Sequence, residues 1–342
     1  MKAAIFNPYL DTLGGGERYT LAFAKVLKDH GWEVYLQWGS GGILKKLEDR
    51  FGYDLQAINV VSDVKRGSGY DLCFWVSDGS IPILSSRKNI LHFQFPFHNV
   101  EGKSLINKMK FFKVNHIVCN SKFTKKVIDD EYGVKSKVIY PPIDTKKIRA
   151  KRKEKIILYV GRFSQLAQSK RQDVLVKCFK KLVKSGKYPN WKLVLAGGTE
   201  VGADLYVKQL TKGIKGYPIE IIKSPDYKTI TNLYGKAKFF WSAAGLGENE
   251  KKHPEKVEHF GITTVEAMSA GDVPIVYNAG GQREIIRDGK NGFLWKKENE
   301  LVKLTKVLID DNKLRNRISK GAMDSSHKYS YERFEKEVSA II

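Results

Sequence analysis

The stretch Glu258–Gly271, E-H-F-G-I-T-T-V-E-A-M-S-A-G, is the most informative feature of this chain. Two carboxylates, Glu258 and Glu266, flank a Phe-Gly-Ile turn, and one of two threonines, Thr263 or Thr264, is placed to cap a short helix that the final glycine ends. Amides at a helix N-terminus bind phosphate, and fixed carboxylates accept hydrogen bonds from hydroxyls. The pattern favours a ligand that carries both groups. An ordinary capped helix with an acidic first turn has the same sequence features.

A second informative element lies at the N-terminus. Lys2–Asn7 reads as a buried strand, and the glycine run Gly14–Gly16 leads into the periodic run Tyr19–Leu27. Strand, glycine loop and helix let backbone N–H groups approach a diphosphate closely, because glycine has no Cβ. The spacing matches neither the dinucleotide fingerprint nor a Walker loop. A plain flexible turn is the alternative.

Length and composition set the outer limits. With 342 residues and 42% hydrophobic content, the chain suggests two domains of roughly 150 residues each. No segment reaches the ~20 apolar residues of a membrane span, and the first residues enter a strand too early for a signal peptide. Three widely spaced cysteines, with no metal pattern, indicate a reduced, cytoplasmic setting. The net charge of +23 favours polyanionic partners, although a solvated surface also explains it.

Apolar strands alternate with helical patterns in the first half, which predicts a parallel, doubly wound α/β sheet. The predicted strands are Ala3–Asn7, Glu33–Gln37, Leu72–Val76, Asn89–Phe93, His116–Cys119 and Lys137–Tyr140, and the predicted helices are Glu17–Gly31, Gly42–Phe51, Ser104–Lys113 and Ser121–Tyr132.

The composition then changes, because seven of the ten residues Lys146–Lys155 are basic, which is typical of a domain linker. After it the same rhythm restarts. The predicted strands of the second half are Lys155–Gly161, Lys192–Gly197, Ile219–Ile222, Phe239–Ser242 and Val273–Tyr277, and the predicted helices are Asp173–Ser185, Asp204–Gly213, Thr229–Gly235 and Thr263–Ala270. We therefore expect an N-terminal domain over residues 1–148, a C-terminal domain over 155–326, and a final helix, 327–342, that packs back at the junction.

Taken together, these patterns resemble glycosyltransferase family 4, the retaining nucleotide-sugar transferases with the GT-B fold of two Rossmann-like domains facing across a cleft. The resemblance covers nearly the whole chain. It rests on Gly14–Arg18, Tyr140–Asp144, Tyr159–Phe163 with Lys170-Arg171, Glu258 with Glu266, and Asn278–Gly281, in family order. The triple glycine Gly14–Gly16, the stretch Glu258–Ile262 and the stretch Tyr140–Asp144 look most like GDP-mannose-dependent mannosyltransferases of lipid-linked oligosaccharide synthesis.

The resemblance implies which residues bind the donor. Departure of a diphosphate needs cations, and Arg162 and Lys170 match the family's clamp. The loop before Lys170 is longer than the usual spacing, so Arg171 competes for that role. Glu258 is expected to hold sugar hydroxyls near the reacting carbon, and Glu266 the ribose.

The remaining expected contacts come from strand ends and backbone amides. His92 matches the family histidine near the sugar, although a lone histidine at a strand end is often structural. The other expected substrate-binding residues are Gly15, Gly16, Gly261, Ile262, Thr263 and Ser224.

The family is thought to retain configuration by front-face attack, in which the departing phosphate oxygen takes the acceptor's proton. No paired-carboxylate glycosidase pattern is visible. The chain has no Asp-x-Asp sequence for Mn²⁺ or Mg²⁺, so no metal and no separate cofactor is expected, with GDP-mannose or a UDP-sugar as donor substrate. The charged insertion Gly247–Val257 reads as either a lid or a surface loop.

The acceptor, a glycan or a lipid-linked sugar, is expected at the N-terminal domain. The segment Gly102–Asn115 places four apolar residues on one helical face, with four lysines around it and Phe111 expected to be exposed among them. It reads either as a peripheral contact with anionic lipid at the cytoplasmic membrane face or as a core-packed helix with a basic outer side.

The chain is therefore predicted to be a retaining hexosyltransferase, with mannose favoured. Charge alone also permits a nucleic-acid-binding protein. However, the sequence shows no nucleic-acid-binding module, and no nucleic acid is expected as a partner. An inactive sugar-nucleotide sensor of the same fold is a further alternative, which the joint presence of Arg162, Lys170, Glu258 and Glu266 disfavours.

Overall fold

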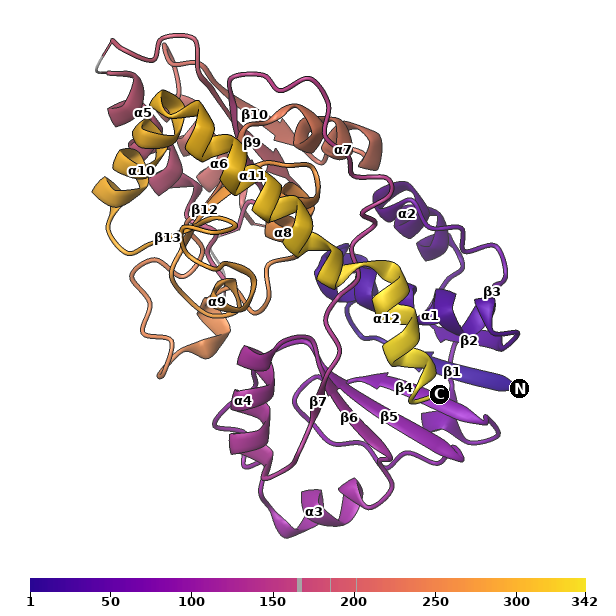
Figure 1. Ribbon diagram of the computed structural model, residues 1–342. Coiled ribbons are helices and arrows are strands. Elements are labelled where there is room, and N and C mark those ends of the chain that lie inside the picture. The colour runs from indigo at the N-terminus through magenta and orange to yellow at the C-terminus, as the bar shows by residue number, and fades with distance from the viewer. Residues whose placement is uncertain (165–167, 185, 201) are drawn as a thin grey trace. The chain divides into compact units, whose positions relative to one another are not determined.

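The computed structural model describes residues 1–164, 168–184, 186–200 and 202–342 and divides the chain into two compact units (Figure 1). Unit 1 comprises Met1–Pro142 and Tyr331–Ile342, and unit 2 comprises Ile143–Ser330. Each unit is built on one sheet whose neighbouring strands all run parallel among the described residues. The predicted fold class, two Rossmann-like doubly wound α/β units, is confirmed.

The sheet of unit 1 carries its helices between successive strands. Its strands, in spatial order, are β3 (Ile58–Val61), β2 (Glu33–Gln37), β1 (Lys2–Phe6), β4 (Leu72–Val76), β5 (Lys88–Phe93), β6 (His116–Cys119) and β7 (Lys137–Val138). Its helices are α1 (Gly15–Asp29), α2 (Gly42–Phe51), α3 (Leu105–Phe111), α4 (Lys122–Tyr132) and α12 (Tyr331–Ser339), with short 3₁₀ turns at Leu10–Thr12 and Lys65–Gly67.

Unit 2 repeats the scheme. Its strands, in spatial order, are β10 (Ile219–Lys223), β9 (Lys192–Gly197), β8 (Ile156–Val160), β11 (Phe239–Ser242), β12 (Val273–Tyr277) and β13 (Phe293–Trp295). Its helices are α5 (Gln172–Val183), α6 (Asp204–Gly213), α7 (Tyr227–Lys236), α8 (Ile262–Ser269), α9 (Gln282–Ile285), α10 (Glu298–Asp310) and α11 (Asn312–Ser326), with 3₁₀ turns at Pro254–Lys256 and His327–Tyr329.

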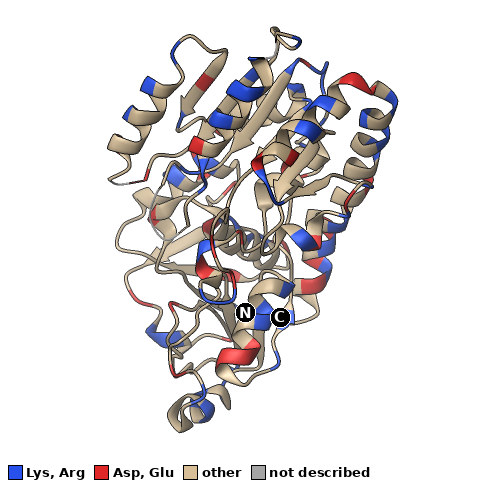
Figure 2. Ribbon diagram, turned by 90° about the vertical axis from the view of Figure 1, so that its left-hand side faces the viewer, with Lys and Arg blue, Asp and Glu red and all other residues tan. Residues whose placement is uncertain are grey.

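Lysine and arginine residues are spread over helices and loops along the chain, with acidic residues between them (Figure 2). The basic segment predicted as a linker contacts unit 2. The N–H of Lys151 donates to the carbonyl of Gly235, and Lys153 forms an ion pair with the buried Asp272.

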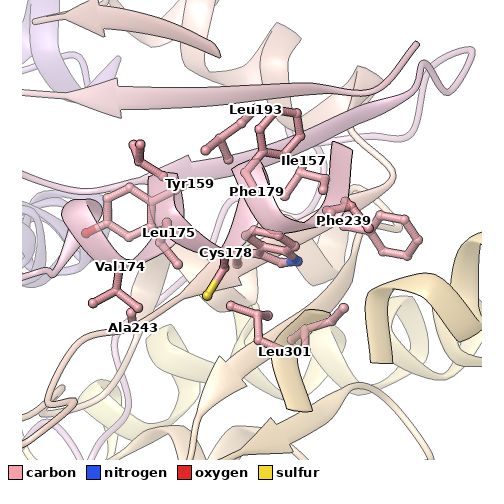
Figure 3. Packing of buried hydrophobic residues seen from close by; sticks show 14 of the residues in the cluster. Ile157, Tyr159, Val174, Leu175, Cys178, Phe179, Leu193, Phe239, Ala243 and Leu301 are labelled. Atoms are coloured by element: carbon pink, nitrogen blue, oxygen red, sulfur yellow. The ribbon is translucent and has the colours of Figure 1, made fainter. Parts of the chain in front are cut away.

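The core of unit 2 forms where α5 and α10 pack on the central strands (Figure 3). All five residues of β8 are buried, as expected for a central parallel strand covered on both faces. Tyr159, Phe179 and Phe239 are among its largest buried side chains. Because all of β8 is buried, the position of its carboxyl end is fixed, and the position of Gly161 and Arg162, which follow it, is constrained in turn.

The last helix confirms the prediction that the C-terminus packs on the first unit. Phe334 and Val338 of α12 and the following Ile341 lie in the same apolar cluster as residues of α1. The Arg333 guanidinium donates to the carbonyl of Tyr140 at 2.8 Å, and the Nζ of Lys88 donates to the carbonyl of Ile342 at 2.8 Å. This helix therefore completes the core of unit 1.

Candidate functional site

The candidate site of unit 2 lies at the carboxyl ends of its strands. Strand order reverses between β8 and β11, and ligands of open α/β sheets bind outside the strand ends at such a reversal. Arg162 follows β8, Ala243 follows β11, and Ser224 follows β10. A Cβ on Gly197 would lie 2.0 Å from the carbonyl oxygen of Gly161, so glycine lets the ends of β8 and β9 come together.

Lys170 and Glu258, 88 positions apart in sequence, form the polar centre of this site. The Lys170 Nζ donates to Glu258 Oε2 at 2.8 Å and to Gln168 Oε1 at 2.7 Å. Their side chains are only 13% and 18% exposed, so the pair is largely removed from water. An ammonium group has three donors, and two are used here. Among the residues that the structure describes, the third N–H of Lys170 has no acceptor, so it can donate to a ligand.

The Glu258 carboxyl group is held in its ionised form. Burial raises its pKa, but the neighbouring Lys170, with smaller effects from His259 and Arg162, outweighs burial and leaves the pKa lowered. The backbone around it is fixed by glycines, since the N–H of Gly281 donates to the carbonyl of Glu258 at 2.7 Å and a Cβ on Gly280 would lie 2.2 Å from that oxygen. An ionised carboxylate on a fixed backbone is suited to accept hydrogen bonds from hydroxyls.

The two other predicted cations behave differently. The Arg162 guanidinium lies 3.7 Å from Glu200 in an exposed pair, which is weak enough to be exchanged for a ligand. Arg171 donates to the carboxylate of Asp173 and, at 2.9 Å, to the carbonyl of Leu246. Of the competing residues Lys170 and Arg171, only Lys170 joins Glu258. The loop before them includes residues 165–167, which lie outside the described residues.

The N-terminus of α8 adds backbone donors. The helix begins at Ile262 after Gly261, which has a φ of +112°, a conformation that suits glycine. The expectation that Thr263 or Thr264 caps the helix is wrong, because both lie inside it. The amides of Ile262 and Thr263 belong to the first turn of the helix, where N–H groups have no acceptor within the helix itself. Four predicted site residues thus gather on one segment with Glu258.

Glu266 lies further along α8 and is 5% exposed. Its Oε2 accepts a hydrogen bond of 2.8 Å from the hydroxyl of Tyr234 on α7. This bond fixes the carboxylate within unit 2. Because one carboxylate oxygen can accept more than one hydrogen bond, the group keeps acceptor capacity for a ligand hydroxyl.

The charged insertion Gly247–Val257 packs against the same region. Glu250 accepts a hydrogen bond from the N–H of Gly280 at 3.1 Å and forms an ion pair with Arg283 at 2.7 Å. The carbonyl of Glu255 lies 3.1 Å from the ring Nε2 of His259. The insertion is therefore bound to the segment that contains Gly280 and Arg283, whose backbone also contacts the carbonyl of Glu258.

In unit 1, the predicted glycine loop opens a helix. Gly15 and Gly16 are the first residues of α1, and the Glu17 carboxylate accepts hydrogen bonds from the Gly14 N–H and the Thr12 hydroxyl. A Cβ on Gly16 would lie only 1.7 Å from the Oε1 of Gln94, the residue that follows β5. The absence of a side chain at Gly16 thus lets the end of the Gln94 side chain lie against the start of α1.

His92 lies near the end of β5, as predicted, and its side chain is buried. It is 0% exposed and its ring stacks on Tyr19 at 4.1 Å and on Phe74 at 5.5 Å. Burial lowers its pKa to about 3, so the ring is neutral at ordinary pH. The ring is thus enclosed in the core of unit 1, and its expected contact with the sugar stays a prediction.

Several polar residues that the sequence analysis did not select belong to these sites. Gln168 bridges Lys170 and the carbonyl of Val257. Gln282 is 2% exposed against Gly261, and Gln94 lies against Gly16; the Oε1 of each has no partner among the described residues. A polar residue inside the apolar run Phe93–Pro96 was the available signal for Gln94. Nothing in the local sequence marks Gln168.

Within the part of the chain that the structure describes, no three His, Cys, Asp or Glu side chains are grouped so as to hold a metal ion. Among the same residues, no helix has the length and apolar character to cross a bilayer.

Two parallel α/β units, with a cation–carboxylate pair beside a helix N-terminus at a strand-order reversal, define a class of nucleotide-sugar-dependent transferases. Sequence comparison gives the family. The model described as "Glycosyl transferases group 1" matches residues 142–324, and "Glycosyltransferase Family 4" matches residues 13–147. The chain belongs to the group 1 glycosyl transferases, and it is a retaining, nucleotide-sugar-dependent enzyme of the GT-B fold.

Individual relatives are distant. An uncharacterised glycosyltransferase of Methanocaldococcus jannaschii is 25% identical over 85% of this chain and 80% of its own length. The human GDP-Man:Man(3)GlcNAc(2)-PP-Dol alpha-1,2-mannosyltransferase is 26% identical over 74% of this chain, which spans 52% of that protein. The chain thus covers about half the length of this curated mannosyltransferase.

Solved structures share the fold. A glycosyltransferase from Rickettsia africae superposes with a TM-score of 0.79 at 19% identity, covering 99% of this chain and 97% of that one. HepE from Anabaena, solved in complex with UDP and glucose, has a TM-score of 0.73 at 16% identity, with 99% and 98% covered. Both likenesses extend over the whole chain.

Proposed function

We propose that the enzyme transfers a hexose, with mannose favoured, from a nucleoside diphosphate sugar to a glycan or lipid-linked acceptor. The Lys170–Glu258 pair is the observation that carries this proposal. It places a cation and an ionised carboxylate side by side, with Glu258 only four positions before the first residue of α8. A leaving diphosphate and sugar hydroxyls need these two kinds of group.

The reaction breaks the bond between the anomeric carbon and the diphosphate oxygen and forms a bond from that carbon to an acceptor hydroxyl oxygen. The acceptor's proton passes to the departing phosphate oxygen, so no protein nucleophile is consumed. Lys170 and Arg162 balance the negative charge on the diphosphate, together with the amides of Ile262 and Thr263. Glu258 binds sugar hydroxyls and Glu266 binds the ribose. Metal independence follows from this set of cations.

The remaining assignments of the site are part of the same proposal. Gly15 and Gly16 supply amides in unit 1, and Ser224, exposed at the end of β10, contacts the base through its backbone. We assign the sugar-facing position of unit 1 to Gln94 in place of His92, since Gln94 ends the strand beside Gly16. The proposed functional domains extend over residues 1–148 and 155–326, and residues 327–342 form the C-terminal helical segment.

Glu258→Gln tests the proposal. Transfer should fall at least about a hundredfold, because the neutral amide no longer pairs with Lys170 or accepts hydroxyls as strongly. Glu298→Gln is the matched control, since Glu298 forms a comparable Glu–Lys pair with Lys177 in the same unit. Circular dichroism melts check the fold of both variants. Unchanged turnover in Glu258→Gln would reject the site.

The donor is tested by thermal shift with GDP, UDP and ADP, followed by transfer assays with the matching sugars. Mannose is favoured because the curated relatives include GDP-mannose-dependent enzymes. Stabilisation by GDP alone supports this choice, and stabilisation by UDP alone replaces it with a UDP-sugar. Nucleotide binding without transfer to any glycan acceptor would indicate a sugar-nucleotide sensor. We place the enzyme in the cytoplasm, in peripheral contact with a membrane.

A further inference from the structure

Helix α3 of unit 1 exposes its apolar face. Leu105, Ile106, Met109 and Phe112 are 74%, 67%, 63% and 89% exposed, and they make up four of the most exposed large apolar side chains of the described residues. Positions 105, 106, 109 and 112 follow helical spacing, so they form one surface. A contiguous apolar surface of this kind marks an interaction site, because scattered single residues are the normal pattern.

The opposite side of the helix holds this surface in place. Phe111 packs edge-to-face against Tyr132 of α4, with ring centroids 6.1 Å apart. The preceding loop is tied to α4 by the Glu131 carboxylate, which accepts hydrogen bonds from the N–H groups of Asn99, Val100 and Gly102. Ser104 caps the helix by accepting from the N–H of Asn107. The sequence-based expectation that Phe111 is exposed is therefore wrong, and Phe112 is the exposed aromatic residue.

Four lysines, Lys103, Lys108, Lys110 and Lys113, surround the apolar face. No ion pair engages them within the described ranges of the chain, and Glu101 is the nearest acidic residue in sequence. An apolar centre with an unpaired basic rim has the chemistry of a surface that lies in the headgroup region of an anionic bilayer. Lipid phosphates there match the lysines, and acyl chains match the apolar residues.

We propose that α3 and its flanking lysines form a docking surface for an anionic lipid bilayer. A second copy of the chain fits less well, because a two-fold interface through α3 would bring two sets of four lysines together. A protein partner would need both carboxylates and a matching pocket for a helix of only seven residues. A fluid bilayer needs neither shape complementarity nor a fixed register. The proposal is independent of the donor and of transfer chemistry.

Vesicle co-sedimentation of the full chain tests this surface. Vesicles of phosphatidylcholine alone and of phosphatidylcholine with phosphatidylglycerol are the probes. Wild type should bind the anionic vesicles, with affinity falling as salt rises, and should bind the neutral ones weakly. Replacing all four apolar residues by Gln should weaken binding at least about tenfold. Replacing the four lysines by Gln should lower it by about fivefold per lysine at low salt.

Matched controls separate α3 from the general charge of the chain. Leu205→Gln with Val307→Gln removes exposed apolar residues of unit 2, and replacing Lys208, Lys212, Lys215 and Lys303 by Gln removes the same net charge elsewhere. Neither control should change binding, and Glu258→Gln should bind like wild type. Equal losses in the lysine control would show that diffuse charge is responsible and would overturn the proposal. Failure of wild type to bind either vesicle would also overturn it.

A site-specific label gives a second readout. Cys73, Cys119 and Cys178 are buried, so Phe112→Cys introduces an exposed thiol for an environment-sensitive dye. Its emission should shift to the blue with anionic vesicles, whereas a dye at Leu205→Cys should not respond. Sedimentation velocity without lipid should give the same sedimentation coefficient for wild type and for the variant in which the four apolar residues are replaced by Gln. Self-association abolished by that variant would assign the surface to a second copy instead.

Discussion

Lys170 and Arg171 are adjacent in sequence but lie in different electrostatic settings. Lys170 contacts Glu258 and Gln168 and keeps one donor, whereas Arg171 contacts Asp173 and the carbonyl of Leu246. The difference arises because Lys170 lies in the loop, whereas Arg171, at a φ of +52°, is the N-cap residue immediately before α5. The backbone conformation at this junction determines which cation faces Glu258.

Lys170→Gln should therefore lower kcat/KM at least about a hundredfold, because it removes a charge that develops its full effect as the diphosphate leaves. Arg171→Gln should lower it by less than about tenfold, since that side chain supports the loop rather than a ligand. Steady-state kinetics on the two purified variants give the comparison. A larger loss in Arg171→Gln would exchange the two assignments.

Asp272 gives a pH-dependent prediction. Burial raises its pKa to about 7, although its partner Lys153 lowers it, whereas an aspartate of an unfolded chain titrates near about 4. Between these values the folded state binds more protons, so this group stabilises the fold below about pH 4 and its contribution is lost as the pH rises through about 7. Wild type should lose about 1–3 kcal/mol more than Asp272→Asn over this window.

Urea denaturation at several pH values measures that difference. Comparing the two proteins cancels the opposite trend of carboxylates with lowered pKa, such as Glu258. Asp324→Asn, an exposed site, should follow wild type. Parallel stability curves for wild type and Asp272→Asn would contradict the raised pKa.

At the scale of elements, the approach of β5 to the start of α1 depends on the absence of a side chain at Gly16. Gly16→Ala places a methyl group 1.7 Å from Gln94 Oε1, so Gln94 or the helix must move. The atoms that the methyl group meets belong to the flexible end of the Gln94 side chain, so we expect a stability loss of at most about 1 kcal/mol, together with reduced transfer. The double variant Gly16→Ala with Gln94→Ala should recover most of the stability but not the activity, because the clash is removed together with the Gln94 amide.

Gly39→Ala is the control for this experiment, since a Cβ at Gly39 meets nothing within 4 Å. Thermal denaturation of wild type, the single variants Gly16→Ala and Gln94→Ala, and the double variant gives the coupling free energy between the two positions. Additive losses in the double variant would show that Gln94 is not the group that Gly16 accommodates.

At the scale of the whole molecule, charge for the leaving group comes from side chains and helix amides. Transfer should therefore survive dialysis against EDTA, with activity within about twofold of the untreated enzyme. Adding Mg²⁺ or Mn²⁺ afterwards should not raise it further. A strict requirement for either ion would refute the clamp built on Arg162 and Lys170, while leaving the fold assignment untouched.

Local sequence patterns predicted most central strands because a parallel sheet requires short, continuous apolar runs between turn residues. Edge strands β3 and β13 and helices α9, α10 and α11 were not predicted. β3, Ile58–Val61, is short and only partly buried, so little apolar pattern distinguishes it from a loop. For His92 the sequence left open whether the side chain is structural or faces the sugar, because a strand end alone does not tell which way its side chain faces.

The sequence by itself determined the family, the alternation of strand and helix, and the residue types that a nucleotide-sugar site needs. Spacing and chemical type are local properties, and they survive in the linear order of the chain. Only the tertiary structure decided that Lys170 rather than Arg171 joins Glu258, that Gln94 lies against Gly16, and that α3 keeps its apolar face outside the core. These outcomes depend on contacts between distant segments, which packing and burial select after the elements have formed.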